Sequence, residues 1–354
     1  MEIKSSIAAI LFESKKDLIV DRIFFPDKLK SGQVLVRIIS SGICGAQINE
    51  IDAIKGRDKF LPHLLGHEGF CEVIECDKDV TTLKVNDYAI MHWRPGSGIQ
   101  ADPAKYTWME KDLNAGWVTT FSEYAVVSEN RLTKIIPGQI KNSLLPLLGC
   151  ALTTAYGVVK NEALPRISDN ILILGVGGVG ISLIVVLRYL GCRNITVADT
   201  VENKLLLAEK LGIKSNFIFR DKSNFISEIL KVYGQSFYDV VFETTGSTDC
   251  IEAGYELSSE KGKIILIGVP KAGQKASIYT LPLHFGKRFF GSEGGASQPN
   301  EDIPYLIERI KAGEIDLESF PITEISLDRI NEGINQLRKG AIGRVVIQMG
   351  DPRV

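Results

Sequence analysis

Two cysteines and one histidine in the first half of the chain have the chemistry of metal ligands. Cys44 lies in the segment SGICG, His67 in GHEG, and Cys150 in LLGCALTTAYG. Two thiolates and an imidazole on separate elements would form a three-ligand zinc site with its fourth position open to a substrate, which is the catalytic rather than the structural arrangement. Spacing alone also allows the alternative that these cysteines are buried core residues and the histidine is satisfied inside the fold.

A glycine-rich turn in the middle of the chain is typical of a dinucleotide-binding site. It has the spacing GxGxxG, directly after an expected strand and at the start of an expected helix. The first glycine permits a tight turn, the second lets the backbone approach a pyrophosphate, and the third allows close packing of helix on strand. The residues expected to contact the cofactor are Gly175, Val176, Gly177, Gly178, Val179 and Gly180. The alternative is a turn that only joins a strand to a helix.

An acidic residue at the end of the following strand indicates which dinucleotide binds. Asp199 stands nineteen residues beyond Gly180, where a carboxylate accepts hydrogen bonds from an adenosine ribose. It would repel the 2′-phosphate of NADP, and Thr200 rather than an arginine follows it, so NAD is favoured. Lys204, one helical turn further on, could lie along the ribose or be an exposed helix residue.

The elements that position these residues fall into two patterns. Up to residue 148 the chain shows short β-rich runs at 7–12, 18–23 and 34–39, which predict a small barrel or folded sheet, and 92–118 is expected to be a long ordered surface loop. After Cys150 strands and helices alternate, which predicts a parallel doubly wound sheet. The expected strands are 170–174, 195–198, 217–219, 240–243 and 263–269, and the expected helices are 178–190, 202–211, 223–232 and 250–257. Beyond 294 we expect helices at 303–312 and 327–338 and a strand at 344–349.

Composition places the protein among ordinary globular chains. Its 354 residues are 45% apolar and 24% charged, which predicts about two domains and argues against disorder. A formal charge of -2 gives no footprint for nucleic acid, and apolar stretches such as 181–187 are too short to span a membrane. The start MEIKSS lacks the organisation of a signal peptide, and six cysteines occur without a CxxC pair. We therefore expect free thiols, a cytoplasmic location, and neither a nucleic-acid nor a membrane partner.

Taken together, the sequence motifs resemble those of the zinc-dependent medium-chain alcohol dehydrogenases. The matching blocks are SGICG, PHLLGHEG, VNDYAI, FSEYAVV, LLGCALTTAYG, ILILGVGGVG, DVVFETTGS and IGRVVI, in the family's order along nearly the whole chain. The resemblance implies an α/β fold with a GroES-like β-rich catalytic domain, formed by 1–150 and 293–354, and a Rossmann NAD-binding domain at 151–292. It also implies a homodimer or homotetramer that acts on a small alcohol or carbonyl compound.

The resemblance also implies roles for individual residues. Cys44, His67 and Cys150 would bind the catalytic zinc, and Glu68 would be the acidic residue able to approach the metal. The remaining cofactor contacts implied in this way are Thr154, Asp199, Lys204, Gly268 and Arg344, the last of which matches a residue that meets the pyrophosphate.

The chain departs from the family pattern at the proton relay and at the second metal. Many members carry a serine or threonine and a histidine where this chain has Ala46 and Asn49, and an acidic residue where it has Gln47. The proton would then leave through water, the cofactor ribose, Asn49 or a group in the 92–117 segment. No cysteine lies between Cys76 and Cys150, so we expect one catalytic zinc and no structural zinc.

The substrate is indicated only in outline. Trp93 falls where relatives place an aromatic ring against the substrate, and His92 and Arg94 flank it. A basic group there would suit a polyol or sugar derivative, although Arg94 could equally be a solvated loop residue. The alternatives to a zinc enzyme are a zinc-free quinone or enone reductase of the same superfamily, whose members lose the three ligands, and a non-catalytic nucleotide-binding relative.

Overall fold

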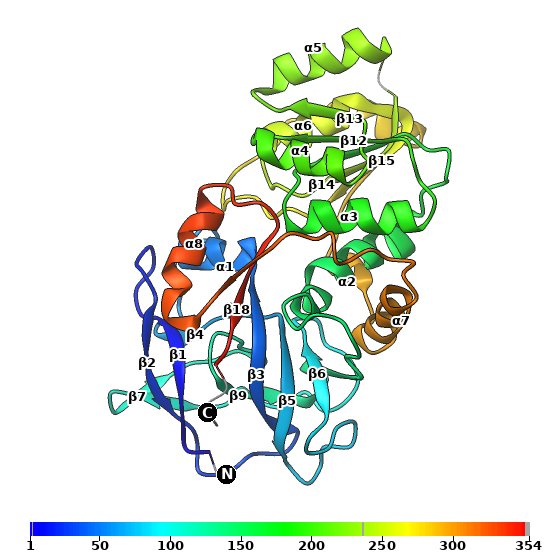
Figure 1. Cartoon of the computed structure of the whole chain (residues 1–354). Helices are drawn as coiled ribbons and strands as arrows, with labels where there is room; N and C mark the ends of the chain where they lie inside the picture. Colours follow the sequence, from blue (N-terminus) through cyan, green and yellow to red (C-terminus); the bar gives the residue numbers. More distant parts are fainter. Residues whose placement is uncertain (2, 236, 351–354) are drawn as a thin grey trace. The chain divides into compact units, whose positions relative to one another are not determined.

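The computed structural model describes residues 1, 3–235 and 237–350, which fold into two compact units (Figure 1). Unit 1 consists of Met1–Thr153 and Gln298–Val354, and unit 2 consists of Thr154–Ser297. None of the helices in these described ranges is long and apolar enough to cross a membrane.

Unit 1 is built from two β-sheets. The first has the order β4 (His63–Leu64), β1 (Ser5–Leu11), β2 (Ile19–Phe24), β7 (Tyr106–Trp108) and β8 (Lys111–Leu113). The second has the order β10 (Leu132–Ile135), β6 (Tyr88–Met91), β5 (Gly69–Cys76), β3 (Gln33–Ile43), β18 (Arg344–Gln348) and β17 (Ile322–Ile325), with β9 (Tyr124–Ser128) also paired to β3. The last strand of the chain thus pairs with β3, which leads directly to Cys44.

Apolar residues at alternate strand positions form the core of unit 1. One cluster includes Ile10 and Leu35, and another joins Ile43 of β3 to Ile330 and Ile334. Such side chains stabilise the fold by roughly 1.5–3 kcal/mol each when fully buried. The helices of unit 1 are α1 (Gly45–Ile51), η1 (Glu129–Arg131), η2 (Leu145–Gly149), α7 (Pro299–Lys311), η6 (Leu327–Arg329) and α8 (Ile330–Arg338).

Unit 2 is a parallel six-stranded sheet with intervening helices. Its strand order is β13 (Ser215–Ile218), β12 (Ile195–Asp199), β11 (Ile171–Leu174), β14 (Tyr238–Glu243), β15 (Ser258–Leu266) and β16 (Arg288–Gly291). Every pairing is parallel, and the chain order runs outwards from β11 in both directions, so the doubly wound sheet is confirmed. The helices are α2 (Ala151–Gly157), which begins in unit 1, η3 (Val158–Ala163), α3 (Gly178–Tyr189), α4 (Glu202–Lys210), α5 (Lys222–Tyr233), α6 (Thr248–Leu257), η4 (Leu281–Phe285) and η5 (Gly294–Ala296).

The prediction of a surface loop over 92–118 is wrong for its second half. Residues 106–113 form the hairpin of β7 and β8, and Trp108 is buried with its indole N–H donating to Asp21 Oδ2 at 2.8 Å. The hairpin turn has positive φ at both Met109 and Glu110, at 50° and 60°. Such turns usually contain Asn-Gly or Asp-Gly, so Met-Glu gave no turn signal in the sequence.

Candidate metal centre and nucleotide site

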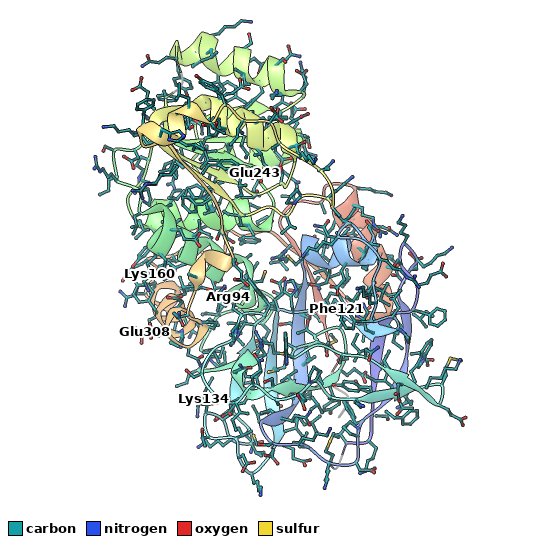
Figure 2. The ribbon with its side chains drawn as sticks, turned by 180° about the vertical axis from the view of Figure 1, so that it is seen from behind. Arg94, Phe121, Lys134, Lys160, Glu243 and Glu308 are labelled. Carbon is teal, nitrogen blue, oxygen red and sulfur yellow. The ribbon has the colours of Figure 1, made fainter. Side chains whose placement is uncertain are left out.

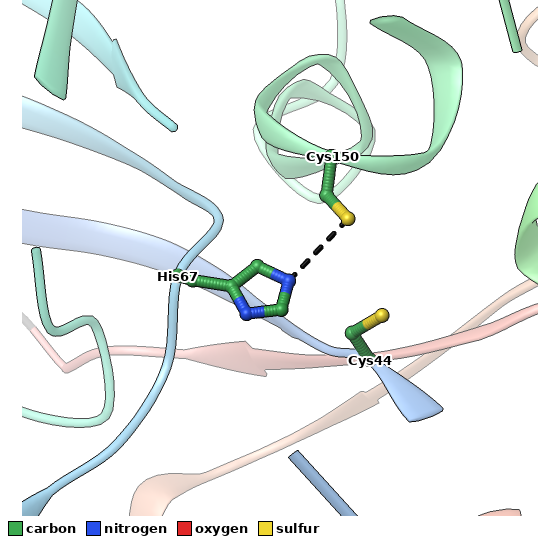
Figure 3. Close-up of side chains that lie close together, drawn as sticks. All are labelled: Cys44, His67 and Cys150. Atoms are coloured by element: carbon green, nitrogen blue, oxygen red, sulfur yellow. Dashed lines mark hydrogen bonds between the residues drawn. The ribbon is translucent and has the colours of Figure 1, made fainter. Parts of the chain in front are cut away.

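Three segments of unit 1 bring Cys44, His67 and Cys150 together (Figure 3). Cys44 follows the end of β3 and occupies the N-cap of α1, while His67 lies in the short connection between β4 and β5. Cys150 lies between η2 and α2. The end of a strand and two tight connections hold the three side chains, so the rigid sheet rather than a mobile loop sets their positions.

The donor atoms of these three residues match a zinc site in both kind and spacing. Their sulfur and nitrogen atoms all lie within 4.8 Å of one another, and His67 Nε2 is 3.3 Å from Cys150 Sγ. When four ligands bind zinc in a tetrahedron with bonds of about 2.0–2.3 Å, the distances between neighbouring ligand atoms are similar to those between the donor atoms of these three residues. Two thiols and an imidazole therefore fit the zinc ion that this donor set prefers.

The electrostatics of the cluster favour one thiolate even without a metal. The hydrogen bond from the Cys150 thiol lowers the pKa of Cys44 well below its usual range, and the same pairing raises the pKa of Cys150. Burial is the largest influence on His67 and opposes a charged ring, but the hydrogen bond with Cys44 and the negative charges of Cys44 and Glu68 together outweigh burial and raise the pKa of His67. Because a bound zinc takes both sulfurs as thiolates, metal binding would release protons from this cluster.

A buried ion pair lies beside the metal ligands. Arg344 Nε is 3.1 Å from Glu68 Oε1, with both side chains nearly inaccessible to solvent, and burial raises the pKa of Glu68 to about 7. Glycine at position 42 leaves room for this carboxylate, because a Cβ there would lie 2.1 Å from Glu68 Oε1 and would displace it. The family resemblance implies separate roles for Glu68 and Arg344 and does not indicate their pairing, since Glu68 precedes β5 and Arg344 begins β18.

The residues at the expected relay positions lie on α1. Ala46 is exposed, Asn49 is half-buried, and Gln47 is buried with its Oε1 lacking a hydrogen-bond partner. Neither an alanine methyl group nor an asparagine amide can take up and release a proton as an imidazole does. The absence of the usual hydroxyl and imidazole at these positions is thus a real difference in chemistry.

His92 holds the loop after β6 and is unsuited to proton transfer. Its Nε2 is 2.9 Å from Thr133 Oγ1 and its Nδ1 is 2.7 Å from the Arg94 carbonyl oxygen, so both nitrogens are engaged. Burial lowers its pKa to about 4, which keeps the ring neutral. The guanidinium of Arg94, labelled in Figure 2, lies over the adjacent Trp93 ring, with its central carbon 5.6 Å from the ring centre.

The glycine-rich turn of unit 2 connects β11 to α3. Gly175 has a φ of +95°, which favours glycine, and a Cβ at Gly180 would lie 2.0 Å from the Gly175 carbonyl oxygen. At Gly177 nothing lies within 4 Å of the Cβ position, so the space over the turn is open. Gly177 is the N-cap of α3, and because the first N–H groups of a helix have no partner within it, this helix N-terminus suits a pyrophosphate.

Asp199, at the end of β12, is bonded to the same turn. Its Oδ2 accepts the Val176 N–H at 2.8 Å, and its Oδ1 accepts the Val201 N–H at 3.0 Å. Lys204 Nζ lies 3.6 Å from Asp199 Oδ2, so the lysine that the sequence left undecided is oriented towards this carboxylate. The turn, the carboxylate and the lysine thus form one local arrangement.

Two other predicted cofactor residues, and one that the sequence did not single out, also lie in unit 2. Thr154 is buried in α2, and Gly268 packs so closely on the turn after β14 that its Cβ would lie 2.2 Å from the Gly246 nitrogen. Glu243, labelled in Figure 2, is fully buried at the end of β14 and accepts hydrogen bonds from the N–H groups of Thr245 and Gly246. Its place at the carboxyl end of a strand, inside DVVFETTGS, was the available signal.

Comparison with known proteins agrees with this arrangement. A family profile described as the alcohol dehydrogenase GroES-like domain matches residues 30–137, and one described as zinc-binding dehydrogenase matches residues 178–312. S-(hydroxymethyl)glutathione dehydrogenase from Escherichia coli O1:K1 / APEC is 28% identical, and the alignment covers 97% of this chain and 99% of that protein. The chain belongs to the zinc-dependent medium-chain alcohol dehydrogenase family.

Solved structures of alcohol dehydrogenases share the fold. Benzyl alcohol dehydrogenase from Acinetobacter calcoaceticus has a TM-score of 0.86 at 23% identity, and covers 98% of this chain and 100% of its own. An alcohol dehydrogenase zinc-binding domain protein from Burkholderia ambifaria has a TM-score of 0.88 at 22% identity, with the same coverage. These findings confirm the predicted family and the GroES-like plus Rossmann fold.

Family membership also confirms the predicted class of activity. The protein is a zinc-dependent oxidoreductase that interconverts alcohols and carbonyl compounds. The family implies zinc and NAD as cofactors, and the Cys44, His67 and Cys150 group is present for the metal.

Proposed function

We propose that the enzyme oxidises a hydroxyl group of a polyol or sugar derivative with NAD, or reduces the corresponding carbonyl, at one catalytic zinc held by Cys44, His67 and Cys150. The convergence of these three donor groups within 4.8 Å carries the proposal. The same convergence disfavours a zinc-free reductase, because such an enzyme would not need three metal ligands close together. Zinc, when bound, supplies a Lewis acid for the substrate oxygen, and NAD supplies the hydride acceptor.

The chain's own residues hold the reactants and set the local charge. The two thiolates neutralise the ion, and Glu68 with Arg344 adds a paired carboxylate beside it. In the proposed domain arrangement, 1–150 with 293–354 carries catalysis and 151–292 binds NAD. In the NAD-binding domain, backbone N–H groups of the Gly175–Gly180 turn hold the pyrophosphate, and Asp199 accepts hydrogen bonds from the hydroxyl groups of the adenosine ribose. Thr154, Gly268 and Arg344 are proposed as further cofactor contacts.

The proton has to leave by a route without a histidine relay. Asn49 can position a water molecule or a ribose hydroxyl but cannot itself titrate, and both nitrogens of His92 are already engaged. We therefore assign proton exit to water and the cofactor ribose, with Asn49 as a hydrogen-bonding residue.

Arg94 and Trp93 support a hydroxyl-rich or anionic substrate. They follow Met91, whose carbonyl oxygen would be 2.2 Å from a Cβ at Gly149, the residue before the ligand Cys150. The loop that carries the arginine thus begins against the metal centre. The related Escherichia coli protein is named for S-(hydroxymethyl)glutathione, which also combines a hydroxymethyl group with anionic groups.

A homodimer or homotetramer is the proposed assembly. Tyr279 and Phe285 of unit 2 expose 69% and 71% of their surface, and β16 forms an edge of the six-stranded sheet. Large exposed apolar side chains and a strand at the edge of a sheet each favour contact with a second copy. Light scattering on the purified protein tests this assembly.

A substrate panel with a matched pair of variants tests the proposed substrate class. The zinc-loaded enzyme should show a higher kcat/KM with NAD on polyols, sugars or their phosphates than on ethanol. Arg94→Met should lower kcat/KM on an anionic substrate by about 10- to 100-fold, because a hydrogen bond to a charged group contributes about 1.5–3 kcal/mol. Arg57→Met, a change at an exposed arginine of the same unit, is the control. If the wild-type enzyme had a higher kcat/KM on ethanol than on polyols and sugars, and neither variant changed this preference, the proposed polyol or sugar substrate class would be refuted.

A further inference from the structure

A second set of metal-binding side chains lies in unit 1, separate from the three cysteine and histidine ligands. Glu50 at the end of α1, Asp58 in the following loop and His63 in β4 form this second donor cluster, and their donor atoms lie within 4.8 Å of one another. His63 Nε2 is 2.7 Å from Asp58 Oδ2 and 4.0 Å from Glu50 Oε1. One imidazole and two carboxylates thus converge from three segments.

Hydrogen bonds outside the cluster orient two of its donors. His63 Nδ1 lies 3.0 Å from the Leu64 carbonyl oxygen, so this nitrogen carries a proton and donates it. In the neutral ring, Nε2 then presents a lone pair to a carboxylate oxygen. The Phe60 N–H donates to Asp58 Oδ1 at 2.8 Å, which turns Oδ2 towards the histidine. The lone pairs of His63 Nε2 and Asp58 Oδ2 would repel each other unless a cation lies between them. That cation is either a second proton on the ring or a metal ion.

We propose that the second donor cluster binds a divalent transition-metal ion such as Zn²⁺. A proton on the ring would satisfy Asp58 alone, whereas a metal ion also accounts for the second carboxylate, Glu50. Metal-bound histidines typically donate their other ring N–H to a backbone carbonyl, as His63 does to Leu64. Zinc accepts histidine nitrogen and carboxylate oxygen as ligands.

The exposure of the cluster fits an exchangeable site. The side chains of His63 and Asp58 are 8% and 11% exposed, whereas that of Glu50 is 44% exposed. The ion would therefore have an entry path from solvent and room for water ligands on the Glu50 side. With no thiolate among its ligands, the site would bind zinc more weakly than the centre at Cys44, His67 and Cys150.

The ion would hold the helix that follows the first catalytic ligand. Glu50 is on α1, which begins directly after Cys44, and Gln47 Nε2 donates to Glu50 Oε2 at 3.3 Å. A shared ion would fasten the end of α1 to β4. It would thereby fix Gln47 and Asn49 on the intervening turn, so its role is to position α1 rather than to take part in the reaction.

Zinc binding by the full-length protein tests the proposal. Protein dialysed to retain only tightly bound zinc is titrated with Zn²⁺ by equilibrium dialysis, and the expected result is one further equivalent per chain. Glu50→Gln, an exposed change that leaves the fold intact, should weaken this binding at least tenfold, and His63→Asn should abolish it. His284→Asn and Asp112→Asn, which lie outside both clusters, should bind as the wild type does.

Two results would overturn the proposal. One is the absence of a further equivalent at a millimolar free Zn²⁺ concentration, which would leave a protonated His63 paired with Asp58. The other is undiminished binding in both Glu50→Gln and His63→Asn, which would place the ion elsewhere. Cobalt substitution keeps the two centres distinct, because thiolate-to-cobalt charge-transfer absorption reports only on Cys44 and Cys150. A loss of that absorption would count against the catalytic centre and not against the second donor cluster.

Discussion

The metal centre of unit 1 and the nucleotide turn of unit 2 are built in opposite ways. The metal centre uses three side chains that are up to 106 positions apart in the sequence, Cys44, His67 and Cys150, and its chemistry depends on their functional groups. The turn from Gly175 to Gly180 is contiguous and depends on the absence of side chains and on backbone N–H groups. The metal centre is therefore sensitive to the loss of a ligand atom, and the glycine turn is sensitive to the addition of a side-chain atom.

The two sites also differ in how they manage charge. Unit 1 buries Glu68 and Arg344 as an ion pair beside the ligands, and breaking such a pair leaves an uncompensated buried charge. In unit 2, Asp199 is neutralised by backbone N–H groups and by Lys204, all within the same local arrangement. Substitutions in unit 1 should thus affect metal and fold together, whereas unit 2 allows cofactor binding to be altered with the fold kept.

Removal of one sulfur ligand should have the largest effect. Cys150→Ser is expected to lose the tightly bound zinc and to lower kcat by about a thousandfold or more, since a Lewis-acid metal contributes several kcal/mol to transition-state stabilisation. Elemental analysis and steady-state kinetics measure both changes. Cys76→Ser, a half-buried cysteine of the same unit outside the site, is the control. Full activity in Cys150→Ser would contradict the ligand assignment.

Two alanine substitutions in the turn should separate cofactor binding from stability. Gly177→Ala adds a methyl group to open space, so NADH affinity should fall by about 10- to 100-fold through lost pyrophosphate hydrogen bonds, with unfolding unchanged. Gly180→Ala places its Cβ 2.0 Å from a backbone oxygen, so overpacking should lower the free energy of unfolding by about 1–3 kcal/mol. NADH fluorescence titration and urea unfolding are the measurements. Wild-type NADH affinity in Gly177→Ala would argue against the pyrophosphate position.

Removal of the Asp199 carboxylate should change the choice of cofactor. Asp199→Gly is expected to raise the ratio of kcat/KM for NADP to that for NAD by roughly tenfold or more, because apposed like charges cost several kcal/mol. Glu202→Gln, an exposed carboxylate at the start of α4, should leave the ratio unchanged. If the wild type used both cofactors equally well, Asp199 would not be the selecting residue.

Restoring the relay should have the smallest effect. Ala46→Ser with Asn49→His is expected to raise kcat on small alcohols several-fold, less than the 10²- to 10⁴-fold that a fully positioned acid-base group typically contributes. The two single variants are the controls. An unchanged rate in the double variant, together with no solvent isotope effect in the wild type, would mean that proton exit is not rate-limiting and that Ala46 and Asn49 shape the substrate pocket instead.

The sequence predicted unit 2 more completely than unit 1, for a physical reason. Near-continuous apolar strands such as β11 and β14, separated by amphipathic helices, carry the information for a parallel sheet locally. Contacts in unit 1 join distant segments, and the hairpin at 106–113 lacks the residues that usually mark its turn. The sequence therefore predicts a loop where the structure has a hairpin.

For the metal centre, the ligand types could be predicted but their surroundings could not. The segments SGICG and GHEG identified Cys44 and His67. The pairing of Glu68 with Arg344 depends on β18 lying against β3, a contact between strands some 300 residues apart. His63 is a different case, because Glu50 and Asp58 are only 13 and 5 positions away in the sequence, and it is the folding of α1, the following loop and β4 that brings their donor atoms together.

Zinc removal and restoration tests the central claim most directly. NADH formation from a panel of alcohols, polyols and sugars is followed before chelation, after zinc has been removed, and after one equivalent has been returned. We expect activity on at least one hydroxyl substrate to disappear on removal and to return with one equivalent in the wild type but not in Cys150→Ser. Activity that persists after complete zinc removal would contradict a catalytic zinc at Cys44, His67 and Cys150.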